Sequence, residues 1–449
     1  MPPRLVPSLH WRAMDGSVFR RRAGAAAGTY ASIVLGFLAT LVAARVFSTA
    51  GLGLYTIVIS SAGFFQTLLD LTIEEALIKF GFRYIAREDW GRLRQLFRRT
   101  FAFKVLGATL AGAALVGLAF GSGAVFHHHS LRGPLAISAL LPLAQSPEGM
   151  AAVPLMLRGR YDVRGAFLAV SMALRLAAVA VGAHFGLSWT IAAIVLAQVA
   201  ASAAVGAAGA AAFRRFPRRE LRPLGEDARE ILRFIAQSSG ATGVVSLRGA
   251  LTPMLLGVVS SAQQVGFFRV AQSPQTGFNA VSAPIRLVLL TDQTREWERG
   301  RSDRVFAGVR RYTLLAFLGS LVLLPLLLVF MPQIVRLLFQ SKNLGAVDAA
   351  RIIVAAGAVQ FVVGWSKSFA VTVGRPNLRI WTHGIETVVL IPLAVVFGWI
   401  WGASGAAAAV LVSSVVFALA WAVLYARIRR EPPPPAHAPL EPEIVGLPT

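Results

Sequence analysis

The chain contains 449 residues, of which 56% are hydrophobic and only 14% are charged, whereas an ordinary soluble domain carries roughly 25% charged residues. The composition therefore excludes a soluble globular protein and favours one whose solvent is the phospholipid bilayer. The formal net charge of +23 does not indicate nucleic acid as a partner, because the basic residues lie between apolar segments instead of gathering on a soluble face. Cysteine is absent, which excludes disulfide bonds, thiolate metal sites and cysteine nucleophiles.

Twelve apolar segments follow one another along the chain, each long enough for a helix that crosses the ~30 Å hydrocarbon core of a bilayer. The first follows a basic stretch that ends in Arg20-Arg21-Arg22, and it lacks a small-residue cleavage site, so we expect a retained helix. In chain order, the predicted spans cover residues 24–46, 53–78, 101–120, 134–157, 165–185, 189–212, 231–259, 264–290, 311–331, 346–370, 380–401 and 403–426.

The breaks between the spans alternate in charge, and this alternation predicts the orientation of the chain. Most lysine and arginine residues fall in alternate breaks and in the two chain ends, whereas the intervening breaks hold only Arg132, Arg336 and Lys342. Because lysine and arginine close to a span resist translocation, we expect both termini in the cytoplasm. The cytoplasmic breaks are then 79–100, 158–164, 213–230, 291–310 and 371–379.

Two pairs of short motifs recur at equivalent joints and indicate a duplicated architecture. The pattern Gly-Arg-x-x-x-Arg occurs at 159–164 and at 374–379, and the turn at 46–55 is echoed at 258–268. We therefore predict an all-α membrane protein of about twelve transmembrane helices, in two pseudo-symmetric six-helix lobes around a central cavity. The predicted divisions are a cytoplasmic segment 1–23, an N-lobe 24–212, a basic linker 213–230, a C-lobe 231–426 and a disordered proline-rich cytoplasmic tail 427–449.

Polar side chains inside the spans are the strongest sequence signals of function, because a charge in the hydrocarbon core costs at least ~2.5 kcal/mol. Span eight carries polar residues at intervals of three, four, three and seven, which places them on one helical face: Arg269, Gln272, Thr276, Asn279 and Arg286. Span two repeats this pattern with Gln66, Asp70 and Glu74. A continuous polar stripe predicts a helix that lines water or substrate.

Arginine is the chief cation among these polar positions in both halves, and its guanidinium group offers a planar pair of donors that matches a phosphate. The expected substrate-binding residues are Arg45, Arg175, Arg248, Arg269, Gln272 and Asn279. The expected residues for charge balance or for a coupling cation are Asp70, Glu148 and Glu386. For each, the sequence leaves open a structural role, either in a buried ion pair or, for Arg45 near a span end, in reaching the membrane interface.

No residue pattern indicates a catalytic group, a resident metal or a cofactor. The run His127-His128-His129 does not predict a metal site, because three successive residues of a helix or strand do not converge on one ion. We expect it to lie in a solvated outer loop.

The joint after span one, in which Arg45 precedes a short turn and Gly51-Leu52-Gly53-Leu54-Tyr55, resembles that of polysaccharide-biosynthesis flippases of the Wzx type. These flippases belong to the MATE-like multidrug/oligosaccharidyl-lipid/polysaccharide superfamily, whose two lobes open alternately to each side of the membrane. The resemblance implies a multi-pass protein of the bacterial inner membrane and a substrate of oligosaccharide linked to undecaprenyl diphosphate. It further implies the glycan polymerase and glycosyltransferases of the same pathway as partners.

We therefore expect a flippase for polysaccharide biosynthesis, which translocates its substrate and makes or breaks no bond. The nearest alternative is a cation-coupled multidrug exporter of the same fold, for which we would expect an acidic, aromatic cavity in place of an arginine stripe. A lipid-linked glycosyltransferase or glycan polymerase is a less favoured alternative, because the short outer breaks lack catalytic carboxylates. A non-transporting scaffold would have no use for buried arginines.

Overall fold

The computed structural model describes residues 16–69, 73–275, 293, 296–297, 300–375 and 377–431. All regular elements within these residues are helices, which confirms the all-α fold expected from the sequence. Eight helical segments of the described chain are long and apolar enough to cross a membrane. The longest of them, at the carboxyl end, holds the last two predicted spans.

The amino-terminal half is a bundle whose helices follow predicted spans one to six. The second span comprises α2 and α3, and the fourth comprises α6 and α7. The helices are α1 (Gly16–Val46), α2 (Thr49–Leu69), α3 (Ile73–Ala86), α4 (Trp90–Phe120), α5 (Ser122–Phe126), α6 (Arg132–Ser138), α7 (Leu140–Leu157), α8 (Tyr161–Gly182) and α9 (Leu187–Arg214), with short 3-10 turns η1 (His129–Leu131) and η2 (Ala183–Phe185).

The carboxyl-terminal half follows spans seven and nine to twelve, and span eight as far as residue 275, beyond which it lies outside the described residues. Its elements are α10 (Asp227–Val259), α11 (Ala262–Ala271), α13 (Ser302–Phe339), η3 (Ser341–Ala346), α14 (Val347–Val362), α15 (Ser366–Thr372) and α16 (Asn377–Arg430). Gly402 interrupts α16 with φ +58° and ψ −129°, a conformation open to glycine and strained for residues with a Cβ atom. This break separates predicted spans eleven and twelve. The helix then continues to Arg430, four residues beyond the predicted end of the last span.

Small residues let these helices approach closely, as in other membrane bundles. Gly28 of α1 lies against the backbone of Gly165 in α8, so that a side chain at either position would collide with the other helix. Large apolar side chains instead point away from the bundle, among them Leu315, Leu321 and Val322 of α13, which are 60%, 60% and 75% exposed. Such an outer surface suits contact with lipid tails.

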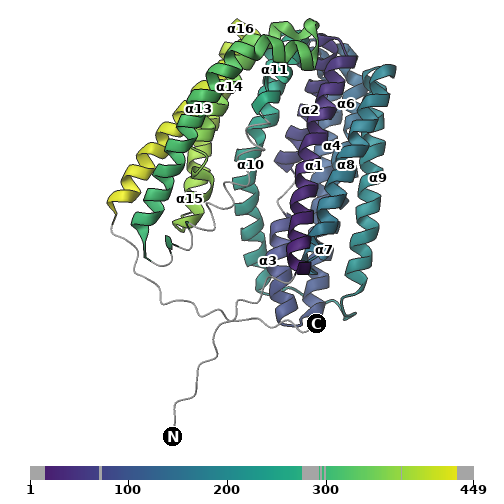
Figure 1. Cartoon of the computed structure of the whole chain (residues 1–449). Coiled ribbons are helices and arrows are strands. Elements are labelled where there is room, and N and C mark those ends of the chain that lie inside the picture. Colours follow the sequence, from purple (N-terminus) through teal and green to yellow (C-terminus); the bar gives the residue numbers. More distant parts are fainter. Residues whose placement is uncertain are drawn as a thin grey trace.

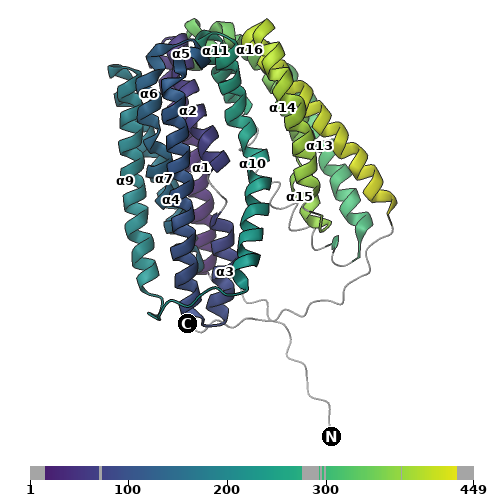
Figure 2. The same ribbon diagram turned by 180° about the vertical axis from the view of Figure 1, so that it is seen from behind.

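Helices α13, α14 and α16 of the C-lobe meet the N-lobe at one end of the molecule and diverge from it toward the other, whereas α10 runs beside the N-lobe (Figures 1 and 2). In both views α13, α14 and α16 approach the N-lobe near α11 and lean away from it toward the opposite end, where α15 lies. We call the meeting end, around residues 46–53 and 260–266, the joint end. The opposite end, with residues 87–90, 158–160 and 215–226, is the basic end.

At the joint end, the two turns that echo each other in sequence pack against one another. Gly53 at the start of α2 lies against the carbonyl of Ala262, and Gly266 of α11 lies against the carbonyl of Thr49. The contact is reciprocal, as two-fold pseudo-symmetry requires. Both positions need glycine, because a Cβ atom at either one would overlap the facing backbone.

Hydrogen bonds close the joint end beside these glycines, and we call this group of residues the joint seal. The Lys342 ammonium donates to the carbonyls of Arg45, at 2.7 Å, and Phe47, at 2.6 Å. The Thr49 hydroxyl donates to the Asn343 side chain at 3.0 Å. The seal therefore joins the α1–α2 turn of the N-lobe to η3 of the C-lobe.

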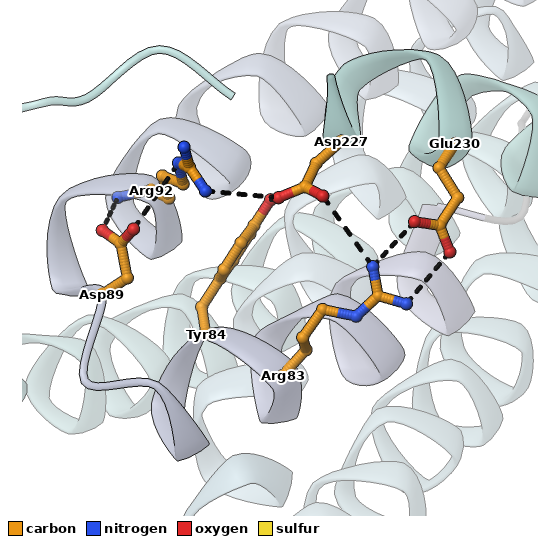
Figure 3. A network of polar contacts seen from close by, with 6 residues as sticks. All are labelled: Arg83, Tyr84, Asp89, Arg92, Asp227 and Glu230. Carbon is orange, nitrogen blue, oxygen red and sulfur yellow. Dashed lines mark hydrogen bonds and ion pairs between the residues drawn. The ribbon is translucent and has the colours of Figure 1, made fainter. Parts of the chain in front are cut away.

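At the basic end, α10 is attached to the N-lobe by a polar network that we call the α10 anchor (Figure 3). Arg83 of α3 forms two hydrogen bonds with Glu230, of 2.8 and 3.0 Å. Tyr84 donates to Asp227 at 3.0 Å, and Arg92 of α4 lies 3.6 Å from the same carboxylate. Asp227 and Glu230 lie in the first turn of α10, where negative charge is favoured by the helix dipole.

The anchor shifts the titration of its members. The hydrogen bond from Arg83 holds the pKa of the Glu230 carboxyl below its ordinary value, and the same bond raises the pKa of the Arg83 guanidinium. Burial raises the pKa of the Tyr84 hydroxyl, and its bond to Asp227 adds to that rise. At neutral pH the Arg83–Glu230 pair is therefore charged and the Tyr84 phenol is a donor.

Candidate functional site

A polar chamber lies between the two lobes, behind the joint seal. It has a volume of about 310 Å³ and is walled by α1, α2 and α8 of the N-lobe and by α11 of the C-lobe. Its polar lining side chains come from both lobes and are Ser32, Thr40, Tyr55, Arg175, Arg269, Gln272 and Ser273. Both lobes thus contribute a guanidinium group to one space, as the central-cavity hypothesis required.

Arg269 is positioned by the first turns of α11. The helix begins after Ser261, whose hydroxyl caps it by accepting from the Gln264 amide. Two turns later, the Arg269 guanidinium donates to the Thr40 hydroxyl of α1 at 3.0 Å. This bond crosses from the C-lobe to the N-lobe and holds the cation at the chamber wall.

Arg175 reaches the same chamber from the middle of α8. Among the residues that the structure describes, no carboxylate forms an ion pair with Arg175 or Arg269. Two cations in a low-dielectric chamber repel each other unless an anion joins them. The chamber therefore has the positive charge and the hydrogen-bond donors that a phosphate or diphosphate group requires.

Arg45 lies elsewhere, because its guanidinium group belongs to the joint end. It donates to the carbonyls of Leu338 and Leu337 at 2.8 and 2.9 Å, in the last turn of α13, where helix carbonyls lack partners within the helix. Arg45 does not line the chamber. Its donors cap a helix, so the structure places it in the contact between the lobes and not beside Arg175 and Arg269.

Of the three remaining residues that we expected to bind substrate, one lines the chamber and the side chains of the other two lie outside the described part of the chain. Gln272 lines the chamber together with Arg269, one turn away, as the stripe on span eight predicted. Asn279 lies outside the described residues, as do Thr276 and Arg286. Arg248 lies within α10, but its side chain is outside the described part.

Thr40, Tyr55 and Ser273 line the chamber and were not among the expected residues. Thr40 carried a weak sequence signal, since it is a polar residue within span one and shares a helical face with Gly36. Tyr55 belongs to the joint motif after span one, which gave no indication that its side chain faces the chamber, and Ser273 carried no signal that separates it from ordinary span residues.

Among the expected carboxylates, Glu148 lies in a second polar pocket, inside the N-lobe. The pocket has a volume of about 210 Å³. Glu148 accepts a 2.6 Å hydrogen bond from Gln198 of α9. Glu74 lies in the same pocket, where it forms a 3.0 Å ion pair with buried Lys104. Within the described residues, Glu148 thus has an amide partner and no basic one.

Glu386 lies in the interior of the C-lobe and is 1% exposed. It is 3.0 Å from Nδ1 of His383, whose ring stacks on Phe417 at 4.8 Å between centroids. This arrangement ties together the two halves of α16, on either side of Gly402. Asp70, the third expected carboxylate, lies outside the described residues.

Comparison with known proteins identifies the family. A family model described as "Polysaccharide biosynthesis protein" matches residues 25–290, which is more than half of the chain. The chain belongs to the polysaccharide biosynthesis protein family. Comparison with curated proteins gave no match.

Solved structures show that this family member shares the fold of known transporters. It is similar to the lipid II flippase MurJ in an inward closed conformation, with a TM-score of 0.70, 11% identity, and coverage of 90% of this chain and 87% of that one. It is also similar to an inward-facing MATE multidrug transporter of the MOP superfamily, with a TM-score of 0.69, 15% identity, and coverage of 88% and 94%.

A third similar structure is a MOP superfamily transporter from Pyrococcus furiosus, described as having a binding pocket of reversed polarity. Its TM-score is 0.58 at 14% identity, with coverage of 92% of this chain and 95% of that one. At these identities the likeness concerns the fold alone. Together with the family match, it confirms a membrane protein of the flippase and transporter class with two helical lobes.

Proposed function

We propose that this protein flips an oligosaccharide linked to undecaprenyl diphosphate across the bacterial inner membrane by alternating access. The observation that carries the proposal is the chamber in which Arg175 of one lobe and Arg269 of the other lie without a carboxylate partner among the described residues. A diphosphate would neutralise both guanidinium groups through charge-assisted hydrogen bonds. Thr40, Gln272 and Ser273 would offer further donors to phosphate or sugar oxygens.

An apolar groove beside the chamber supports a lipid-linked substrate. It lies between α1, α11 and α13 and has a volume of about 320 Å³. Three residues, Ile33, Phe37 and Ser273, line both the chamber and the groove. Leu327 and Met331 of α13 belong to its apolar wall. A polar, cationic space joined to an apolar one matches an amphiphile whose charged head continues into a hydrocarbon tail.

The orientation follows from the distribution of charge. The basic end carries the arginine-rich breaks, so we place this end and both termini in the cytoplasm. The lobes are joined by the seal at the opposite end, and α13–α16 diverge from the N-lobe toward the basic end (Figure 1). The described conformation would therefore receive the substrate from the cytoplasm, and breaking the seal would release it outside.

The Glu148 pocket is our candidate for energy coupling. A carboxylate without a basic partner in a low-dielectric region is stabilised by a proton or a small cation. The charged groups facing this pocket are Glu74 of α3, Lys104 of α4 and Arg164 of α8. Because Lys104 pairs with Glu74, Glu148 is the carboxylate there best suited to exchange a cation. Glu386, paired with His383, is better suited to charge balance within its lobe.

A cationic drug is the less favoured substrate, because two unpaired guanidinium groups would repel it from the chamber. The MATE neighbours share the fold, but transport of a given charge depends on the side chains in the cavity. The proposed flippase and the drug exporter therefore predict opposite charge preferences for the same chamber.

Flipping measured in proteoliposomes tests the proposal. The substrate is an isoprenyl-diphosphate-linked oligosaccharide, and the variants are Arg175→Gln and Arg269→Gln. Each change removes charge-assisted hydrogen bonds worth about 1.5–3 kcal/mol, so we expect the rate to fall at least about tenfold. Arg310→Gln, at an exposed position of α13, is the matched control and retains the rate. Full activity of both chamber variants would contradict the proposal.

A further inference from the structure

A separate apolar groove lies between α4 and α10 near the basic end, remote in sequence and in lining residues from the chamber. Its volume is about 340 Å³, within the range of ligand sites, roughly 300–1,000 Å³. Its apolar wall includes Leu96, Phe103 and Leu106 of α4, and Ile231 and Leu232 of α10. One charged residue, Arg99, joins these walls.

Arg99 lies on the same face of α4 as the apolar residues of the groove. Leu96, Arg99, Phe103 and Leu106 follow at intervals of three, four and three, which aligns them along one side of a helix. Among the described residues, no carboxylate forms an ion pair with Arg99, which is exposed. Arg92, seven residues earlier in α4, instead forms ion pairs with Asp89 and Asp227.

The position of the groove relative to the membrane surface follows from the third predicted span, which begins at residue 101. Phe101, Phe103 and Leu106 are 47%, 41% and 55% exposed, as expected where a helix enters the hydrocarbon core. Arg99 stands one turn before Phe103, at the level of the headgroups. With the orientation proposed above, these are the headgroups of the cytoplasmic leaflet, where anionic lipids attract basic residues.

We propose that this groove binds an anionic phospholipid of the cytoplasmic leaflet, with its phosphate on Arg99 and an acyl chain between α4 and α10. The charge of Arg99 complements an anionic headgroup, and the apolar walls complement a chain. The substrate tail is a poorer occupant, because an apolar groove already adjoins the chamber. The bound lipid bridges α4 and α10 beside the α10 anchor and stabilises that end of α10 against the N-lobe.

Native mass spectrometry of the purified full chain in detergent tests this proposal. Phosphatidylglycerol and phosphatidylcholine with identical acyl chains are added, and the fraction of protein retaining each lipid is measured. We expect preferential retention of phosphatidylglycerol, reduced about fivefold by Arg99→Gln. Arg98→Gln, at the neighbouring exposed arginine outside the groove, leaves the preference unchanged.

A second pair of variants tests the chain-binding part without relying on charge. Ala102 lines the groove, so Ala102→Trp fills it and lowers retention of both lipids. Leu110→Trp, at a 50% exposed position of α4 outside the groove, is the matched control.

Equal retention of the two lipids by the wild type, or wild-type retention by Arg99→Gln, overturns the proposal. Displacement of phosphatidylglycerol by undecaprenyl phosphate at equal concentration would also overturn it, assigning the groove to the substrate. Chamber-dependent flipping is measured separately and does not depend on these outcomes.

Discussion

Two arginines at neighbouring places in the fold have different capacities for a ligand because their surroundings differ. Arg45 donates to two carbonyls at the end of α13, which provide fixed partners for its guanidinium group. Arg269 donates to one hydroxyl, that of Thr40, and keeps other donors at the chamber wall. A guanidinium group carries five donors, so Arg269 retains the capacity to bind an anion.

Glu148 gives the first prediction at the scale of single residues. If this carboxylate exchanges the coupling cation, an imposed proton or sodium gradient accelerates flipping by the wild-type protein but not by Glu148→Gln. The glutamine keeps the shape of the side chain and its contact with Gln198. Its neutral amide, however, neither exchanges a proton nor carries the negative charge that binds a cation. Glu226→Gln, at an exposed position before α10, retains the response. A full gradient response in Glu148→Gln would exclude this role.

At the scale of elements, the reciprocal glycine contacts set how closely α2 and α11 approach. We expect Gly53→Ala and Gly266→Ala each to lower the free energy of unfolding by about 1–3 kcal/mol, because the added methyl group overlaps a facing carbonyl. Gly63→Ala in the same helix α2 meets its nearest atom at an ordinary 3.8 Å and should be neutral or slightly stabilising. Thermal unfolding in one detergent compares the three, and equal midpoints for all would refute the close-contact account.

The α10 anchor makes a pH-dependent prediction. The pKa of Glu230 is lowered from its ordinary value of 4.5 by the bond from Arg83, so the stabilisation from the Arg83–Glu230 pair is present above pH 4.5 and is lost as the pH falls through the lowered value. At pH 7, the backbone amide hydrogens of residues 227–235 should therefore exchange with solvent faster in Glu230→Gln than in the wild type. The difference should disappear in acid. Hydrogen–deuterium exchange measured at both pH values checks this, and identical exchange at pH 7 would contradict it.

At the scale of the whole molecule, the sequence was sufficient to predict the all-α membrane fold and the order of the described spans, because hydropathy and charge are properties of local segments. It also predicted the chamber in outline: Arg175, Arg269 and Gln272 share one space between the lobes. The echo between the two joints had a structural counterpart in the packing of Gly53 and Gly266.

The features that the sequence did not predict depend on contacts between segments far apart in the chain, which local patterns do not encode. Arg45 and Arg269 are both arginines within predicted spans, and the α13 carbonyls that bind Arg45 distinguish its role from that of Arg269. Lys342 and Asn343 looked like ordinary outer-loop residues, yet they bond the α1–α2 turn nearly 300 positions away. Gln198 gave no sign that it would be the partner of Glu148.

The joint seal yields a prediction about the balance between the two openings. Lys342→Ala removes two bonds between the lobes and should raise the population open at the joint end. Because the natural chain has no cysteine, a single cysteine placed at Ala39, which lines the chamber, reports this opening. A membrane-impermeant maleimide added outside should label it faster in Lys342→Ala and at the ordinary rate in Arg336→Ala. Equal rates would show that the seal does not limit opening.

The central claim, that guanidinium groups of both lobes hold one anionic headgroup, is tested most directly by a cryo-electron microscopy map of the protein with a short-chain isoprenyl diphosphate. The account predicts density for the two phosphates within hydrogen-bond distance of both Arg175 and Arg269, with the chain directed into the groove lined by Ile33, Phe37 and Met331. Phosphate density on one arginine alone, or at a site outside the chamber, would contradict it.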